Sequence, residues 1–449
     1  MDMRFIKVRA AVLLLIAAYA VSALAEERKL TLEEVLVLAQ TGNPEIRALH
    51  KSVLGVAEDI GIARSFTLPR ISFEERFMRT NNPTYSFMAK LNQSRFEEAD
   101  FAVESLNHPP AINDFQSSFS VEQPVFVPKA HIAIDMAKKE STAKGEEFDR
   151  KREEVAFRVI KTYLGVQTAK AFVAVSTRGV DDAKEHLRIA TARNNAETGL
   201  YSDMLRAGVA LSSAEEKLVT AQKNLEVAKR ALGLTIGLSE SVEVYAERPR
   251  FEVKTIDYYY ASALSRKDVK SLEIRYKNAE NSLKMANAGY WPVIGVGGSY
   301  QLNSNHNPLG DEGSSWLISA FLRWELFDGA RREHEKEKAK HLIDETAEYL
   351  DGMKKKVSFE VYEAFLGVQE ARKSLDLANA ALGSAEESSR LVKARYENSL
   401  SAIVDLLDVQ TSVDAARANV INREGAYLTA IANLEFQSGT IMKDLSFQK

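Results

Sequence analysis

The placement of proline constrains this chain more than any other feature. Its ten prolines lie at positions 44, 69, 83, 109, 110, 124, 128, 249, 292 and 308. Both long regions without proline, 129–248 and 309–449, are rich in Ala, Glu, Lys, Leu and Gln, which favour helix. An unbroken helix from Lys129 to Thr198 would be roughly 105 Å long. A second from Ala330 to Asn398 would be nearly as long, and such lengths predict coiled-coil or helical-barrel packing.

One stretch of these helices occurs twice. Val155–Lys170 reads VAFRVIKTYLGVQTAK and Val357–Arg372 reads VSFEVYEAFLGVQEAR, and half of the aligned positions are identical. Their apolar residues recur at the spacing of one helix face. We therefore expect two structural repeats, over 26–238 and 256–440, with a linker over 239–255 and a tail over 441–449. Each repeat would contain a helical hairpin, over 129–238 and 330–440, with tips near Thr198–Ala207 and Asn398–Gln410.

Four short segments alternate apolar and polar residues: 71–78, 115–127, 293–302 and 316–327. Alternation over about ten residues is typical of a membrane-spanning β-strand, and also of a half-exposed strand in a soluble sheet. Pro69 and Pro292 precede the first strand of each repeat at the same corner, so each repeat would supply one strand pair. Long polar connections, Thr80–Asp114 and Asn303–Ser315, would join the strands of each pair.

Four strands cannot close a barrel by themselves. An open sheet edge in lipid leaves backbone groups without hydrogen bonds, at several kcal/mol each. If these strands cross a membrane, several copies of the chain must share one barrel, and the residues alone do not fix how many.

Composition excludes several kinds of function. Residues 1–25 combine Arg4, Lys7 and Arg9, an apolar run and Ala23-Leu24-Ala25, which predicts a secretory signal peptide. Its removal takes away three basic residues and one acidic residue and changes the formal charge from -4 to -6, which does not favour nucleic acid. The chain has no cysteine. We find no pattern for a catalytic, metal or cofactor site and expect no enzyme.

In this context the chain resembles the TolC-like outer membrane efflux proteins. Leu30–Ile46 resembles the first mature helix of that family, where Thr31 and Glu34 could form a capping box. The segments SVEQPVFVPKA and LRWELFDGARR resemble its strand-to-helix junctions, and GLYSDMLRA and ARYENSLSAIVDLLDVQ resemble its hairpin tips. The resemblance implies a mainly α fold with a small β part: a homotrimer with a twelve-stranded barrel in the outer membrane, continuous with an α-helical barrel in the periplasm.

The same resemblance implies partners and a gate. A periplasmic adaptor (membrane fusion) protein and an inner-membrane RND or ABC pump would deliver substrates to the periplasmic end. Gate positions carried over from the family are Asp405, Asp408, Tyr396 and Asp203. The tips that would contact the adaptor contain Gly199, Leu200, Ser202, Leu205, Ser399, Leu400 and Ser401. The family prototype has an arginine where this chain has Ser401, so the usual charged latch cannot form there.

Two alternatives remain open from the sequence. Asp405 and Asp408 stand on one helix face near a helix start, where two solvated carboxylates are also favourable. For the whole chain, the alternative to an export duct is a soluble periplasmic coiled-coil scaffold or adaptor, which would explain the helices but not the four strands. The exported substrate is not encoded in any recognisable motif.

Overall fold

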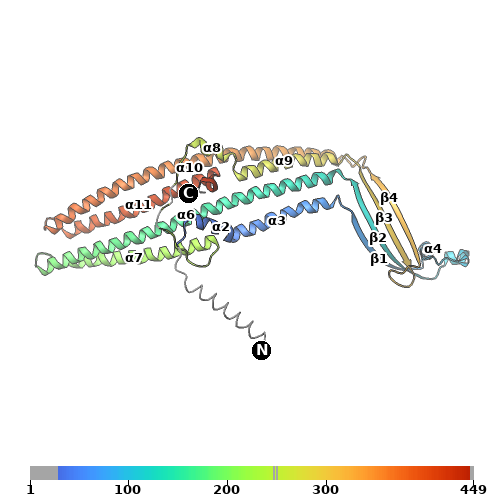
Figure 1. Ribbon diagram of the computed structural model, residues 1–449, viewed down its shortest axis with the longest axis horizontal. Coiled ribbons are helices and arrows are strands. Elements are labelled where there is room, and N and C mark those ends of the chain that lie inside the picture. Colours follow the sequence, from blue (N-terminus) through green and yellow to red (C-terminus); the bar gives the residue numbers. More distant parts are fainter. Residues whose placement is uncertain (1–28, 246–247, 249–250, 445–449) are drawn as a thin grey trace, which may run out of the picture. The chain divides into compact units, whose positions relative to one another are not determined.

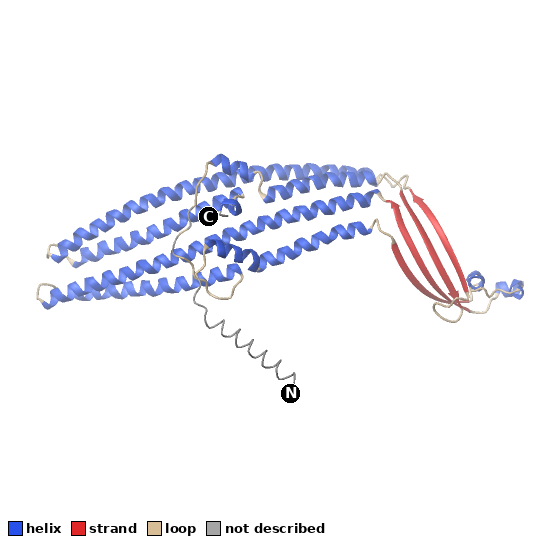
Figure 2. Cartoon of the chain, in the orientation of Figure 1, coloured by secondary structure: helices blue, strands red, loops and turns tan. Residues whose placement is uncertain are grey.

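The computed structural model describes residues 29–245, 248 and 251–444. The signal peptide expected over 1–25 lies outside these residues. Long helices and a single four-stranded sheet make up the fold (Figures 1 and 2), which confirms the expected mainly helical class with a small β part. Two compact units can be separated, and each takes segments from both halves of the sequence.

The first unit comprises the described residues of Met1–Lys51, Glu146–Lys270 and Gly352–Lys449. It contains α2 (Leu32–Gly42), α7 (Tyr201–Ile236), α8 (Ile256–Ala263), α11 (Ile403–Ser438) and α12 (Ile441–Asp444). The C-terminal parts of α6 (Pro128–Asn195) and α10 (Arg331–Glu397) also belong to it. In Figure 1, α7 runs back along α6 and α11 runs back along α10.

The repeated apolar face forms the core of this unit. Val155, Val159, Tyr163 and Val166 of α6 are buried against α2 and α7, and Val357, Val361 and Val368 of α10 are buried as well. Burying one such aliphatic side chain stabilises the folded state by roughly 1.5–3 kcal/mol relative to leaving it in water. The predicted capping box at α2 is confirmed: Glu34 N–H donates to Thr31 Oγ1 (3.2 Å) and Thr31 N–H donates to Glu34 Oε2 (2.9 Å).

The second unit comprises Ser52–Gly145 and Ser271–Asp351. It holds the N-terminal part of α6, the N-terminal part of α10 and most of two helices of 22 residues, α3 (Pro44–Ser65) and α9 (Lys267–Ala288). Its sheet consists of β1 (Arg70–Thr80), β2 (Ile112–Phe126), β3 (Val293–Ser304) and β4 (Gly313–Arg323). The strand expected over 316–327 therefore begins earlier and ends earlier. Residues 324–327 instead turn the chain towards α10, where Trp324 Nε1 donates to the carbonyl of Tyr290 (3.1 Å).

All neighbouring strands of the sheet are antiparallel, in the order β1-β2-β3-β4, so β1 and β4 are its edges. The register aligns residues of one kind on each face, because paired residues share a face. One face is mainly apolar: Ile71, Phe73, Phe77, Phe115, Phe119, Val121, Val296, Tyr300, Trp316, Ile318, Ala320 and Leu322. The other is mainly polar: Ser72, Glu74, Arg76, Gln116, Ser118, Ser120, Glu122, Gln301, Asn303, Ser315, Ser319 and Arg323.

The two long connections at one end of the sheet differ from each other. The connection after β1 is not only a loop, because it contains α4 (Pro83–Asn92), η1 (Glu98–Phe101) and α5 (Val103–Asn107). The connection after β3 is shorter and bends over the apolar face, where the N–H of Leu309 donates to Ser117 Oγ (3.0 Å). We call residues 81–111 the outer insertion.

Candidate functional site at the helical tips

The two hairpin tips have the same backbone. The first connects Asn195 of α6 to Tyr201 of α7, and the second connects Glu397 of α10 to Ile403 of α11, so the tips are 202 residues apart in sequence at both ends. Glu197 and Ser399 take positive φ angles of 57° and 61°. Behind them the N–H of Thr198 donates to the carbonyl of Arg193 (3.0 Å), and the N–H of Leu400 donates to that of Arg395 (2.8 Å). Each long helix thus ends in a left-handed cap that reverses the chain.

A small apolar cluster holds the tips together. Ala190 of α6, Ala207 of α7, Tyr396 of α10, and Ile403 and Leu406 of α11 are all buried in it. All four helices of the two hairpins therefore meet at this cluster. Burial raises the pKa of the Tyr396 hydroxyl, and so does the nearby carboxylate of Asp203, while the Arg193 guanidinium opposes both.

Arg193 bridges the two tips. Its Nη1 donates to the backbone carbonyl of Tyr396 (2.7 Å), and its Nη2 donates to Ser399 Oγ (3.1 Å) and to the carbonyl of Thr198 (3.3 Å). The guanidinium carbon lies 4.6 Å from the centre of the Tyr396 ring, within range of a cation–π interaction. Arg193 of the first hairpin thus contacts three groups of the second: the backbone carbonyl of Tyr396, the ring of Tyr396 and the hydroxyl of Ser399.

The aspartates expected at the gate are placed differently from one another. Asp405 is exposed and accepts the N–H of Ala402 (3.2 Å), so it caps the start of α11. Asp408 is also exposed and lines a groove of about 590 Å³ between α7 and α11. Asp203 is half-buried in the first turn of α7. No hydrogen bond or ion pair is recorded between any two of these three described residues, and only Asp203 contributes to the electrostatics of Tyr396.

A second polar group joins the hairpins farther along the helices. Gln410 of α11 donates to Asp182 of α6 (3.1 Å) and to Asp414 (3.0 Å), while its Oε1 lies 3.4 Å from His186 Nε2. Arg417 contacts Asp182 and Glu386, both at 3.3 Å. His186 is only 3% exposed, and burial lowers the pKa of its imidazole, whose Nδ1 has no hydrogen-bond partner among the described groups. Burial raises the pKa of Asp414.

The residues expected to contact an adaptor are largely at the surface. Leu200, Leu205 and Leu400 are exposed apolar side chains, and Ser202 is exposed between them. Gly199 packs against Arg193, since a Cβ added there would lie 2.9 Å from Arg193 Cβ. Ser399 accepts from Arg193, and the buried hydroxyl of Ser401 has no hydrogen-bond partner in the described structure. The apolar tip surface thus comes from both hairpins.

Tyr396 and Asp203 are brought together, whereas Asp405 and Asp408 remain separate surface carboxylates. Sequence reasoning missed Arg193, His186, Asp182 and Gln410. Arg193 alone carried a signal: it repeats at the same distance from the tip as Arg395, in the last helical turn, where a cation is favoured.

Two kinds of feature are absent from the described residues. Nowhere in 29–245, 248 or 251–444 do three or more His, Asp or Glu side chains gather as a metal site. Within the same ranges no helix has the length and apolar character needed to cross a membrane.

The chain is similar to known proteins over most of its length. A family model for "outer membrane efflux protein" matches residues 35–238 and 258–440. Nodulation protein T of Rhizobium leguminosarum bv. trifolii is 20% identical over 293 residues, which are 63% of this chain and 62% of that protein. The outer membrane efflux protein BepC of Brucella suis biovar 1 is 20% identical over 419 residues, covering 90% of this chain and 86% of BepC.

The fold matches solved structures as well. A membrane protein from Pseudomonas aeruginosa superimposes with a TM-score of 0.75 at 18% sequence identity, covering 91% of this chain and 90% of that one. The family model covers most of the chain, so the expected resemblance to TolC-like proteins is confirmed, as is the outer-membrane location. This chain belongs to the outer membrane efflux protein family.

Proposed function

We propose that the chain is the outer-membrane duct of a tripartite efflux or type I secretion system. Three copies would form one passive channel, which an adaptor protein opens at the periplasmic tips and an inner-membrane RND or ABC pump supplies with substrate. The observation that carries this proposal is the sheet: four strands with one apolar face, one polar face and two open edges.

The sheet has the dimensions and surface of a membrane-spanning wall. Its strands contain 11, 15, 12 and 11 residues, and a tilted strand needs about 9–11 residues to cross a bilayer. Tyr300 and Trp316 lie on the apolar face towards the outer insertion, and Trp291 and Trp324 lie just beyond the opposite ends of β3 and β4, at the junctions with the helices. This distribution is typical of the aromatic girdles of outer-membrane barrels.

The edges require other copies of the chain. β1 and β4 each have one side without a neighbouring strand in the chain, and such an edge is costly in lipid. Pairing β4 of one copy with β1 of the next satisfies both edges, and three copies give the twelve strands expected from the resemblance. The polar face then lines the pore and the apolar face contacts lipid.

The tips supply the gate in this proposal. Arg193 and the Tyr396 cluster hold the hairpins together within one copy. This contact would replace the arginine that the family prototype has at the position of Ser401. Asp405 and Asp408 are exposed at the same end, so a ring of three copies would bring six carboxylates together. Such a ring favours cations. Leu200, Leu205 and Leu400 offer apolar contacts for an adaptor.

Conductance in planar bilayers tests the duct and the gate together. We expect cation-selective channels from the native protein and reduced cation selectivity from Asp405→Ala/Asp408→Ala. The control is Glu215→Ala/Glu216→Ala, which removes the same charge from exposed positions of α7. Unchanged selectivity in the first variant would contradict the gate assignment. Absence of channels, or a stable monomer in buffer without detergent, would contradict the duct and favour the soluble scaffold.

A further inference from the structure

The outer insertion lies on the polar face of the sheet. Gln93, at the end of α4, donates to the carbonyl of Asn113 (2.8 Å) and to Asp114 Oδ1 (2.9 Å), which also accepts from Asn303 Nδ2 (3.0 Å). Asp114 and Asn303 belong to the polar face. Gly313 gives independent support, because a Cβ added to that face would lie 1.9 Å from the carbonyl oxygen of Asn92.

Helix α4 crosses the sheet from one edge to the other. It begins at Pro83, shortly after β1 ends at Thr80, and its last residue touches the first residue of β4. A helix of ten residues is about 15 Å long, and three steps between neighbouring strands amount to about 14 Å. The helix therefore spans the width of the sheet like a chord across an arc.

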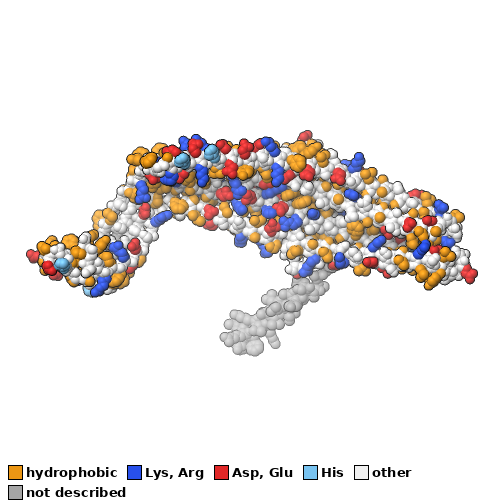
Figure 3. Space-filling view, turned by 180° about the vertical axis from the view of Figure 1, so that it is seen from behind, with side chains coloured by type: hydrophobic (Ala, Val, Ile, Leu, Met, Phe, Trp, Pro, Cys, Tyr) orange, Lys and Arg blue, Asp and Glu red, His pale blue; other side chains and the backbone are white. Residues whose placement is uncertain are grey.

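Three sides of α4 meet different surroundings. Ser86, Ala89 and Gln93 are buried. Phe87 packs edge-on against Phe96, with ring centres 4.8 Å apart, and Lys90 forms an ion pair with Asp100 (2.6 Å). The remaining side carries Tyr85, Met88 and Leu91, which are 56%, 52% and 48% exposed. We call these three residues the apolar ridge; hydrophobic side chains over the insertion are visible in Figure 3.

We propose that three copies of α4 meet through their apolar ridges and constrict the outer mouth of the channel. This inference rests on the proposed function, since it takes the polar face to line the pore. Twelve strands about 4.8 Å apart, tilted by about 40°, form a ring with a radius of roughly 12 Å. The three steps from β1 to β4 are one quarter of such a ring. A chord across them passes roughly 8.5 Å from the axis, and a helix with its side chains has a radius of about 5–6 Å. Because α4 lies on the pore side of the sheet, three such helices leave an opening of about 3 Å in radius or less.

The occupant of the ridge is a second copy for two reasons. The insertion sits on the face opposite to lipid, so the membrane cannot cover the ridge. Its contact with β4 also places it beside the edge that the next copy would pair with. The shorter connection after β3 lies on the apolar face instead, so it does not compete for the mouth.

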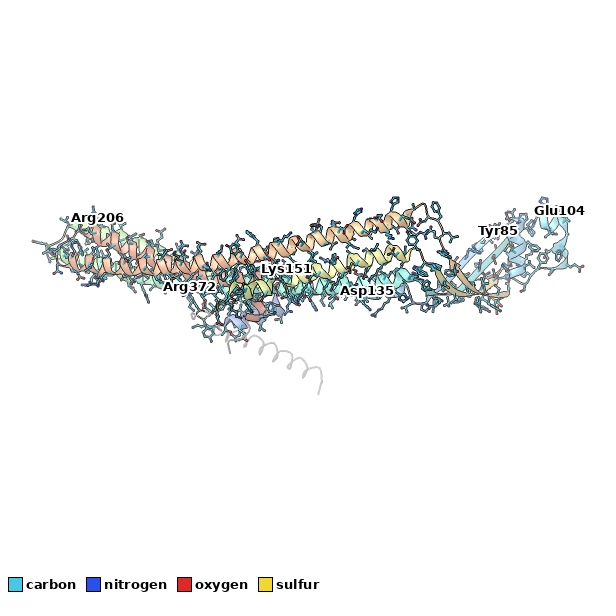
Figure 4. The ribbon with its side chains drawn as sticks, turned by 90° about the horizontal axis from the view of Figure 1, so that it is seen from above. Tyr85, Glu104, Asp135, Lys151, Arg206 and Arg372 are labelled. Atoms are coloured by element: carbon cyan, nitrogen blue, oxygen red, sulfur yellow. The ribbon has the colours of Figure 1, made fainter. Side chains whose placement is uncertain are left out.

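Cysteine crosslinking tests this contact, because the chain has no cysteine of its own. We would introduce Met88→Cys into the full-length protein and treat the purified trimer with a short bismaleimide. The matched control is Glu104→Cys, which is exposed in α5 of the same insertion but lies off the ridge. Figure 4 labels Tyr85 of the ridge and Glu104.

We expect a crosslinked dimer with residual monomer from Met88→Cys, since only two of three thiols can pair, and monomer alone from Glu104→Cys. A trimer in which Met88→Cys gives no dimer would overturn the constriction by α4 and leave the duct intact. A protein that is monomeric before crosslinking would overturn both.

A conductance measurement adds a readout that does not depend on crosslinking. Tyr85→Ser/Met88→Ser/Leu91→Ser changes only exposed positions, so we expect the variant to fold and to show larger single-channel conductance than the native protein. Conductance equal to the native value would overturn the proposal.

Discussion

Glu197 in the first tip and Ser399 in the second occupy the same backbone position, 202 residues apart, yet their surroundings differ. Arg193 reaches from the first tip to the second, whereas the equivalent Arg395 is exposed. Tyr396 is buried where the first hairpin has Asn194, and Ser401 stands where the first has Gly199. The two tips therefore share a backbone conformation but not their side-chain contacts: the first tip contributes the bridging arginine and the second contributes the buried ring. Variants at equivalent positions of the two tips test this asymmetry.

We expect the largest loss of tip stability from Tyr396→Ala, with Asn194→Ala at the equivalent position as the comparison. Removing a buried aromatic ring costs about 3–5 kcal/mol, and here the loss falls on the cluster that joins four helices. Hydrogen exchange of the backbone amides in 393–403 measures the local opening free energy. Asn194→Ala should change it by less than about 0.5 kcal/mol. Equal effects of the two variants would show that the hairpins are energetically symmetrical.

The next effect is that of Arg193→Ala, compared with Arg395→Ala. Arg193 makes three charge-assisted hydrogen bonds at a partly exposed site, so we expect a loss of about 1–2 kcal/mol in tip stability. Arg193→Lys should give an intermediate value, because an ammonium cannot reach all three acceptors as a planar fork does. If Arg395→Ala loosened the tips as much as Arg193→Ala, the bridge would not be specific to one side.

A pH effect of intermediate size is expected from His186. Its pKa is lower in the folded protein than the ordinary value of 6.5, chiefly because it is buried, so the neutral ring is favoured in the packed state. The contribution of the neutral His186 ring to the free energy of unfolding is complete above about pH 6.5 and is lost as the pH falls below this value. Around His186 lie Asp182, Glu185, Lys393 and Gln410. The pKa of Asp414 is raised by burial, so its contribution to stability increases as the pH falls, opposite to that of His186.

His186→Gln tests this assignment, because glutamine does not titrate. Amide protection of the tips should fall between pH 7 and pH 5.5 in the native protein and change less in the variant; this window follows from the ordinary pKa of histidine, about 6.5. His334→Gln, at an exposed position of α10, serves as the control and should retain the native pH dependence.

Ser401→Ala should have the smallest effect. The Ser401 hydroxyl is buried without a partner, so its removal should stabilise the second tip by about 0.5 kcal/mol or less. Destabilisation would mean that the hydroxyl binds a group of a neighbouring copy or an ordered water.

Local sequence signals were sufficient for the long helices and for the existence of the four strands. Proline placement predicted the long helices, alternation located the four strands, and Thr31 and Glu34 form the expected capping box. These features depend on residues close in sequence. The strand at Gly313–Arg323 was misplaced because Trp324, Leu326 and Phe327 continue the apolar character of the strand after the chain has turned.

Contacts across the chain could not be predicted in this way. Arg193 and Tyr396 are 203 residues apart, and Gln410 and Asp182 are 228 residues apart. No local pattern specifies such pairs, since the same side chains would be ordinary surface residues on an isolated helix. The outer insertion was expected to be a polar connection, and its helices and its position on the sheet depend on Gln93, Gly313 and the Phe87–Phe96 pair.

The constant offset of 202 between the hairpins limits how the chain can change in evolution. One residue added to a single long helix would shift its tip by about 1.5 Å and rotate the following residues by about 100°. Arg193 would then face away from the carbonyl of Tyr396. Viable descendants should therefore lengthen or shorten both arms together, in steps close to whole turns.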